Sequence, residues 1–327
     1  MPVKTVLEGV RDAMHDEMKR DPRVFIMGED VGPRGNVFLI TKGFLEEFGR
    51  DRVIDTPLAE ASIVGVAVGA AMAGMRPIAE IQFADFIYPA YNQIVGEAAK
   101  IRYRSAGGNT CPLVIRTPYG GGVRGALSHS VSVEALFYHV PGLKICVPST
   151  PADAQGMLVS AIRDEDPVLF LEHKRTYRLI KGEVPEGDYT VPIGKADIAR
   201  PGKDLSVITY GLMRHFAVEA AEKVASEGVD AEVIDLRTVR PMDRAAILES
   251  VRKTRRALIV HEDQKFGGVG AEISATIAEE ALFDLDAPIR RVCGPDVPAM
   301  GYAKEYEEAF MPSPERIAGA MRELAEF

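Results

Sequence analysis

Residues 143–172, LKICVPSTPADAQGMLVSAIRDEDPVLFLE, contain the pattern that decides the fold. The short apolar runs 143–148 and 168–172 predict two buried strands, and the helical periodicity of residues 152–164 predicts a helix between them. A strand, a helix and a second strand in this order form a crossover unit. Such a unit predicts a largely parallel sheet with helices on both faces.

The same alternation continues on both sides of this unit. In the first half, we expect further strands at 24–28, 77–83 and 113–118, a helix at 86–104 and a buried apolar helix at 63–75. A stretch rich in glycine, proline and charged residues follows. After it the alternation of strands and helices resumes. We expect strands at 205–210, 231–236, 257–260 and 289–292, and helices at 214–227, 244–252, 271–283 and 314–325. The sequence therefore predicts an α/β protein with two parallel-sheet domains, 1–182 and 204–327, joined by a linker, 183–203.

Composition narrows the class of protein. The 327 residues suggest about two domains, and 48 acidic residues against 39 scattered basic ones argue against a nucleic-acid partner. Three cysteines without a Cys-x-x-Cys pair indicate core thiols. The longest apolar run, 63–75, is shorter than the roughly 20 residues of a membrane span, and the charged start of the chain shows no secretory signal. We therefore expect a cytoplasmic protein that does not bind a membrane.

A glycine-rich segment follows one of the expected strands, at the sheet edge where ligands of open α/β proteins bind. Gly120–Gly125 reads GGGVRG and matches the dinucleotide pattern G-x-G-x-x-G, although the next expected strand ends in Pro148-Ser149-Thr150 and offers no acid for a ribose. The alternative is a flexible loop in which glycines adopt positive φ. His129, just beyond, is either a general acid or base or a surface histidine.

Two further segments after strands offer polar and aromatic groups. Glu60 precedes the apolar helix 63–75, where a carboxylate either stabilises the helix start or, desolvated, shares a proton with a ligand nitrogen. Gln82, Phe83 and Phe86 follow the strand 77–83, and the aromatic rings either pack in the core or stack on a flat heteroaromatic ring.

Several segments, taken in order, resemble one known family. They are 28–31 (GEDV), 55–60 (DTPLAE), 81–86 (IQFADF), 103–108 (YRSAGG), 139–144 (HVPGLK), 161–167 (AIRDEDP), 268–273 (GVGAEI) and 288–294 (PIRRVCG). The chain thereby resembles, over nearly its whole length, the beta subunit of the thiamine-diphosphate-dependent decarboxylating component of 2-oxo acid dehydrogenase complexes.

The resemblance implies a pyrimidine-binding domain followed by a transketolase-like C-terminal domain. It also implies an alpha subunit, in an α2β2 heterotetramer, that holds magnesium and the cofactor diphosphate with a Gly-Asp-Gly motif, and this chain has no such motif. Glu60 falls on the glutamate that bonds N1′ of the cofactor pyrimidine, and Gln82 and Phe86 fall on residues that contact that ring.

His129 falls on a histidine that handles the lipoyl group or the acyl intermediate, although Ser130-Val131 replaces the usual Ser-Gln after it. The resemblance also implies a potassium ion, held largely by backbone carbonyls, at Leu113, Ala161, Ile162, Asp164 and Asp166. The implied reaction is oxidative decarboxylation of a small 2-oxo acid, with transfer of the acyl group to the lipoyl group of an acyltransferase component.

The amino-acid sequence of residues 81–85, 103–105 and 291–294 resembles that of the branched-chain members, which act on 2-oxoisovalerate, more than that of the pyruvate members. The sequence leaves three functions open. The first is a branched-chain 2-oxo acid dehydrogenase beta subunit, the second is a pyruvate or acetoin dehydrogenase beta subunit, and the third is a non-catalytic subunit that docks an acyltransferase.

Overall fold

Six parallel strands form a sheet in the first half of the chain, as the sequence predicts. Their spatial order is β6-β7-β5-β4-β2-β3. The strands are β2 (Val24–Gly28), β3 (Val53–Asp55), β4 (Arg76–Glu80), β5 (Val114–Tyr119), β6 (Lys144–Cys146) and β7 (Val168–His173). Five of them coincide with expected strands, and β3 is a short addition at the edge.

The computed structural model describes residues 1–327 and divides into two units. The first unit contains residues 1–119 and 139–193, and the second contains residues 120–138 and 194–327. The segment 120–138, which follows β5, therefore belongs to the second unit although it lies early in the sequence. Within the stretch 183–203, expected to be a linker, the chain passes from one unit to the other between Ile193 and Gly194.

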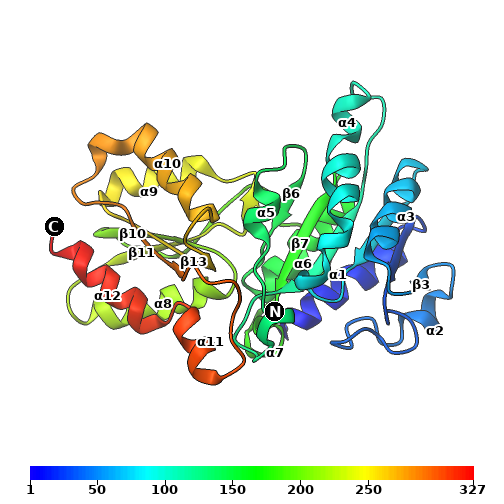
Figure 1. Ribbon diagram of the computed structural model, residues 1–327, viewed down its shortest axis with the longest axis horizontal. Coiled ribbons are helices and arrows are strands. Elements are labelled where there is room, and N and C mark those ends of the chain that lie inside the picture. The colour runs from blue at the N-terminus through cyan, green and yellow to red at the C-terminus, as the bar shows by residue number, and fades with distance from the viewer. The chain divides into compact units, whose positions relative to one another are not determined.

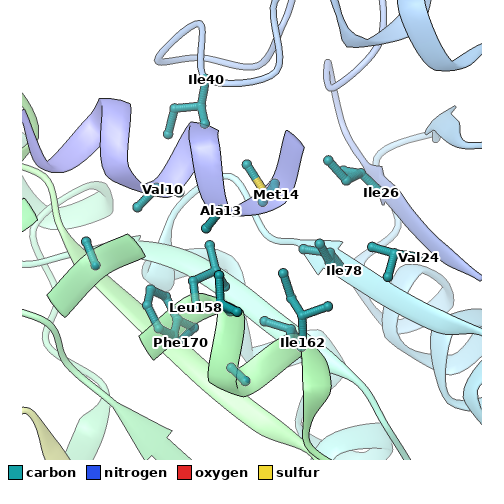
Figure 2. Packing of buried hydrophobic residues seen from close by; sticks show 14 of the residues in the cluster. Val10, Ala13, Met14, Val24, Ile26, Ile40, Ile78, Leu158, Ile162 and Phe170 are labelled. Atoms are coloured by element: carbon teal, nitrogen blue, oxygen red, sulfur yellow. The ribbon is translucent and has the colours of Figure 1, made fainter. Parts of the chain in front are cut away.

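Helices of the first unit enclose its apolar core. They are α1 (Val6–Arg20), α2 (Phe44–Phe48), α3 (Glu60–Met72), α4 (Ile101–Arg104), α6 (Pro151–Arg163) and α7 (Thr176–Leu179), and a small antiparallel pair joins β1 (Val3–Thr5) to β8 (Lys181–Glu183). Figure 2 shows Ala13 of α1 directed toward Leu158 of α6, and Val10 and Met14 of α1 belong to the same buried cluster. Phe170 of β7 belongs to the same fully buried cluster.

Helix α1 is absent from the sequence-based prediction, yet its signals are present. The Thr5 hydroxyl accepts a hydrogen bond from the Glu8 amide at 3.2 Å, and the Glu8 carboxylate accepts one from the Thr5 amide at 2.7 Å. This reciprocal pair is a capping box, which marks the start of a helix. Val10, Ala13 and Met14 recur at helical spacing and are buried.

Two expected helices of the first unit differ from the prediction. The stretch 86–104 is a succession of short turns, comprising 3-10 turns at Ala84–Phe86, Tyr88–Ala90 and Ala98–Lys100, a π-helical segment Asn92–Glu97, and α4. Pro89 and Gly96 interrupt it, which accounts for the loss of a regular helix. Helix α3 is not buried all round, because Val66 and Met72 on one side are 59% and 48% exposed.

The second unit repeats the architecture with one antiparallel edge strand. Its sheet has the order β14-β13-β10-β11-β9, and β9 alone runs antiparallel to its neighbour. The strands are β9 (Asp197–Arg200), β10 (Leu205–Thr209), β11 (Ala231–Asp235), β13 (Ala257–Gln264) and β14 (Arg290–Gly294), and a further short strand is β12 (Thr238–Arg240).

Helices cover both faces of this second sheet. Figure 1 shows α9 (Arg244–Thr254) and α10 (Val269–Ala281) on one face, with α8 (Leu212–Ala225) and α12 (Pro314–Ala325) on the other. Two short helices, α5 (Glu134–Tyr138) and α11 (Lys304–Phe310), and the 3-10 turns Ala126–Ser128 and Leu282–Asp284 complete the unit. All three cysteines of the chain are free and buried, and none of the helices combines the length and apolar character needed to cross a bilayer.

Candidate active site

The carboxyl ends of three neighbouring strands meet at one edge of the first sheet. Gly28, the last residue of β2, is level with Asp55 of β3 on one side and with Glu80 of β4 on the other. The segments that leave these strands therefore start side by side. They carry Glu29 and Asp30, Glu60, and Gln82, so the sheet gathers three of the predicted segments in the place where open α/β sheets bind ligands.

Glu60 is the first residue of α3 and lies close to a second carboxylate. The residue before it, Ala59, makes no side-chain capping hydrogen bond, so the start of α3 lacks the usual cap. Burial, together with the negative charges of Glu60 and Asp30, raises the pKa of Glu29 above its usual value. Glu29 therefore retains a proton to higher pH than a free glutamate does, which is the behaviour of neighbouring carboxyl groups that share a site.

Gln82 and Phe86 lie at the same edge, next to the Glu29 segment. The Gln82 side-chain amide donates a hydrogen bond to Asp30 at 3.2 Å. The half-buried Phe86 ring packs edge-on against Phe83 with ring centroids 5.9 Å apart, and Phe83 in turn packs against Phe38 at 5.8 Å. Through these contacts the structure brings a carboxylate pair, an amide and an aromatic ring to one edge of the sheet.

A buried ionic network, which is not among the features predicted from the sequence, lies in the strands that lead to this edge. Arg116 of β5 is fully buried, and its guanidinium binds Glu172 of β7 through two hydrogen bonds, of 2.8 and 2.6 Å, and also binds Glu80 of β4. The Tyr177 hydroxyl donates to Glu172 at 2.6 Å, and the Asn36 amide donates to Glu80 at 3.1 Å. Because Asn36 also binds two backbone amides of its own loop, the network connects the strands to the segment after β2.

His129 belongs to the second unit, where it follows a loop held by carboxylates. We call residues 120–125 the glycine loop. Its Gly121 amide donates to Glu262 at 2.5 Å, and its Gly122 and Arg124 amides donate to one oxygen of Glu307 at 2.9 and 2.8 Å. A dinucleotide-binding loop would direct such amides at phosphate and would open into an α-helix. Here the amides are occupied and only the 3-10 turn Ala126–Ser128 follows, so the dinucleotide interpretation fails.

The residues predicted to bind potassium lie in the first unit, around the end of α6. The Arg76 guanidinium donates to the carbonyls of Ile162 and Asp164 at 3.0 Å each, and the Lys144 ammonium pairs with the Asp164 carboxylate at 2.6 Å. The Leu113 carbonyl accepts the Val168 amide at 2.9 Å. Several of the predicted oxygen ligands thus already accept hydrogen bonds, although each carbonyl retains a second lone pair.

Comparisons with known proteins define the class to which this fold and site belong. Residues 4–180 match the family model of the transketolase pyrimidine-binding domain, and residues 194–317 match the transketolase C-terminal domain. A solved structure described as a split-gene transketolase, an inactive beta4 tetramer, has the same fold, with a TM-score of 0.80, 24% identity and coverage of 98% of both chains. The chain therefore has a transketolase-like fold in both units.

Full-length relatives narrow the class further. The chain is 61% identical to the 2-oxoisovalerate dehydrogenase subunit beta of Bacillus subtilis (strain 168), over all 327 residues of both chains. It is 46% identical to the pyruvate dehydrogenase E1 component subunit beta of the same organism and 44% identical to that of Staphylococcus aureus (strain N315), again over the full length of both. The chain belongs to the family of 2-oxo acid dehydrogenase beta subunits.

Proposed function

We propose that the chain is the beta subunit of a branched-chain 2-oxo acid dehydrogenase, which decarboxylates 2-oxoisovalerate and related acids oxidatively. The observation that carries this proposal is the full-length identity of 61% to a 2-oxoisovalerate dehydrogenase subunit beta, against 46% and 44% to the two pyruvate dehydrogenase subunits. The sheet-edge group of Glu60, Gln82 and Phe86 supports it, because these residues supply the chemistry that the reaction requires of this subunit.

The proposed cofactor is thiamine diphosphate, and the sheet edge suits its pyrimidine end. A carboxylate at the uncapped start of α3, an amide and a half-buried aromatic ring offer a proton-sharing group, a polar contact and a stacking surface. When bound, the cofactor supplies the carbon nucleophile and the electron sink for loss of carbon dioxide. The task of Glu60 is to share a proton with N1′ of the pyrimidine, and Gln82 and Phe86 orient the ring.

An alpha subunit is proposed to complete the site. The chain has no Gly-Asp-Gly motif, so the cofactor diphosphate and its magnesium ion need ligands from another chain. Helix α3, which begins with Glu60, exposes Val66 and Met72, and Leu58 just before it is 77% exposed. An apolar surface of this kind, next to a functional carboxylate, fits coverage by a partner subunit. The proposed assembly is an α2β2 heterotetramer.

His129 is proposed to act in acyl transfer to the lipoyl group of the acyltransferase component. Its imidazole suits this task because histidine donates and accepts protons near neutral pH. It follows a loop whose backbone amides donate hydrogen bonds to the Glu262 and Glu307 carboxylates, which supports a fixed position for the ring. We propose that this chemistry takes place in the cytoplasm.

Potassium at Leu113, Ala161, Ile162, Asp164 and Asp166 is a separate proposal, supported by the convergence of backbone carbonyls at the end of α6. Thermal unfolding in potassium chloride and in sodium chloride at equal ionic strength tests it. A higher unfolding midpoint in potassium chloride than in sodium chloride for the wild-type protein is the expected result. Equal midpoints in the two salts would contradict it.

A substrate panel on the co-expressed alpha and beta subunits tests the proposed function. We expect kcat/KM for 2-oxoisovalerate to exceed that for pyruvate by about tenfold or more, since each methylene in a fitted pocket contributes roughly 1–3 kcal/mol to discrimination. A preference for pyruvate would instead favour the pyruvate or acetoin assignment. Absence of turnover with any 2-oxo acid, in an intact complex that binds acyltransferase, would favour the docking subunit.

A further inference from the structure

The glycine loop adopts a backbone conformation that it cannot hold alone. Gly120 and Gly122 have φ values of 83° and 79°, and the non-glycine residues Arg124 and Ala126 have φ values of 58° and 54°. Positive φ is unfavourable for residues with a Cβ, and such conformations persist only where the surrounding structure imposes them. The contacts that impose this one must therefore come from outside the loop.

Two carboxylates from the second unit supply those contacts. Glu307 of α11, 7% exposed, receives the Gly122 and Arg124 amides on the single oxygen Oε1. Glu262 of β13, 3% exposed, receives the Gly121 amide. Backbone amides that converge where the signs of φ alternate form an anion-binding concavity. In this protein the anion is a side chain of the chain itself, and charge-assisted hydrogen bonds of this kind are stronger than neutral ones.

The position of His129 depends on the same loop. The Gly120 amide donates to the Val131 carbonyl at 3.0 Å, which closes the segment that contains His129 into a ring. Gly125 lies directly against the backbone carbonyl of His129, so closely that any side chain at Gly125 would collide with it. A shift of the glycine loop must therefore move the backbone of His129.

We propose that Glu307 is a positioning residue, whose carboxylate fixes the glycine loop and thereby places His129 for acyl transfer. The link to acyl transfer rests on the proposed function of His129. The hold on the loop is independent of that function, because it depends only on contacts within the second unit. Neither the sequence pattern nor the family resemblance assigns Glu307 a role.

The experiment compares Glu307→Ala, Glu307→Gln and the control Glu308→Ala in the α2β2 complex. Glu308 is on the same helix but its side chain is 63% exposed. The first readout is limited trypsin cleavage after Arg124. We expect Glu307→Ala to be cleaved about tenfold faster than wild type, because loss of the charged acceptor populates the open loop. Glu307→Gln retains an acceptor oxygen and should restore most of the protection, and Glu308→Ala should behave as wild type.

The second readout separates the two halves of the reaction. Decarboxylation is followed with a soluble dye as electron acceptor, and acyl transfer is followed with an isolated lipoyl domain. Glu307→Ala should lower acyl transfer by about tenfold, as expected for a displaced acid–base group, and leave dye-linked decarboxylation close to wild type. Wild-type trypsin sensitivity of Glu307→Ala would overturn the proposal, and so would an equal loss of both activities.

His129→Ala separates failure of this inference from failure of the proposed function. If His129→Ala transfers acyl groups as wild type does, the role of His129 is wrong, and the proposed link from Glu307 to acyl transfer falls with it. The trypsin readout still decides whether Glu307 holds the loop.

Discussion

At the scale of single residues, the feature with the clearest electrostatic consequence is the Glu29 carboxyl. Its pKa is raised by burial and by the charges of Glu60 and Asp30. A group whose pKa is raised on folding stabilises the fold below its unfolded pKa and loses that contribution as the pH rises. Near neutral pH, Glu29 therefore lowers the stability of the fold, because its buried carboxylate lies close to the negative charges of Glu60 and Asp30.

We predict that Glu29→Gln raises the thermal unfolding midpoint of the full chain at about pH 7. The gain should shrink toward about pH 4, where the wild-type carboxyl is protonated and the repulsion is absent. Unfolding followed by circular dichroism at both pH values measures the difference. Glu46→Gln, at an exposed position on α2, is the control, and a gain of equal size at both pH values would contradict the electrostatic explanation.

The buried Arg116 leads to a second prediction at this scale. Replacing Arg116 by Met leaves Glu80 and Glu172 buried without a cation, and breaking a buried pair in this way costs about 3–5 kcal/mol. Urea unfolding should show that loss for Arg116→Met and only a small change for Arg102→Met, because Arg102 makes an ion pair on the surface with Asp166. Equal, small changes in the free energy of unfolding of the two variants would contradict a stabilising role for the buried network.

At the scale of secondary-structure elements, the sequence predicted regular elements well and irregular ones poorly. Strand β2 and helix α12 begin and end at the predicted residues, because each is a single apolar or amphipathic run with clear boundaries. The periodicity of residues 86–104 predicts a helix, but Pro89 and Gly96 interrupt it in the structure. Helix α1 is not among the predicted helices, and its signal in the sequence is the capping box of Thr5 and Glu8.

The candidate site residues show the same difference between local and non-local signals. Glu60, Gln82 and Phe86 are candidates from the sequence because they follow strands, at the edge where open α/β sheets bind ligands, and because they match the family pattern. The pairing of Glu80, Arg116 and Glu172 requires the register of three strands, which is not visible in the sequence. A charged residue inside an apolar strand was nevertheless a usable signal at each of the three positions. The contact between Glu307 and the glycine loop joins residues 183 or more positions apart, so no local pattern indicates it.

Strand β13 carries the third prediction, which concerns pH. Burial raises the pKa of Asp263 to about 6, with a contribution from the charge of Glu262, and burial also raises the pKa of the nearby Glu134. The stabilising contribution of Asp263 is present below its ordinary pKa of 3.8 and is lost as the pH rises to about 6.

Asp263→Asn should remove that loss. The difference in unfolding free energy between Asp263→Asn and wild type should grow as the pH rises from about 4 to about 6. It should grow by at most about 1.4 kcal/mol per pH unit. Urea unfolding across this range measures the slope. The exposed Asp296→Asn is the control and should follow the wild-type slope. If the unfolding free energies of Asp263→Asn and wild type changed with pH in parallel, Asp263 would not titrate as described.

At the scale of the whole molecule, the proposed function assigns this chain one half of a cofactor site. The sheet edge of the first unit suits a pyrimidine ring, and the sequence has no Gly-Asp-Gly motif to hold magnesium and a diphosphate. The isolated chain should therefore show no measurable binding of thiamine diphosphate and magnesium by calorimetry. The co-purified α2β2 complex should bind both, and micromolar binding by the isolated chain would contradict a divided site.

We infer that Glu60 of this chain shares a proton with a cofactor anchored in its partner. Turnover of 2-oxoisovalerate by the α2β2 complex carrying Glu60→Gln tests this inference, with Glu183→Gln, at an exposed position on β8, as the matched control. We predict that Glu60→Gln assembles normally and loses about a hundredfold or more in kcat, within the 10²–10⁴ range of positioned acid–base groups. A Glu60→Gln complex that turns over at the wild-type rate would contradict the claim.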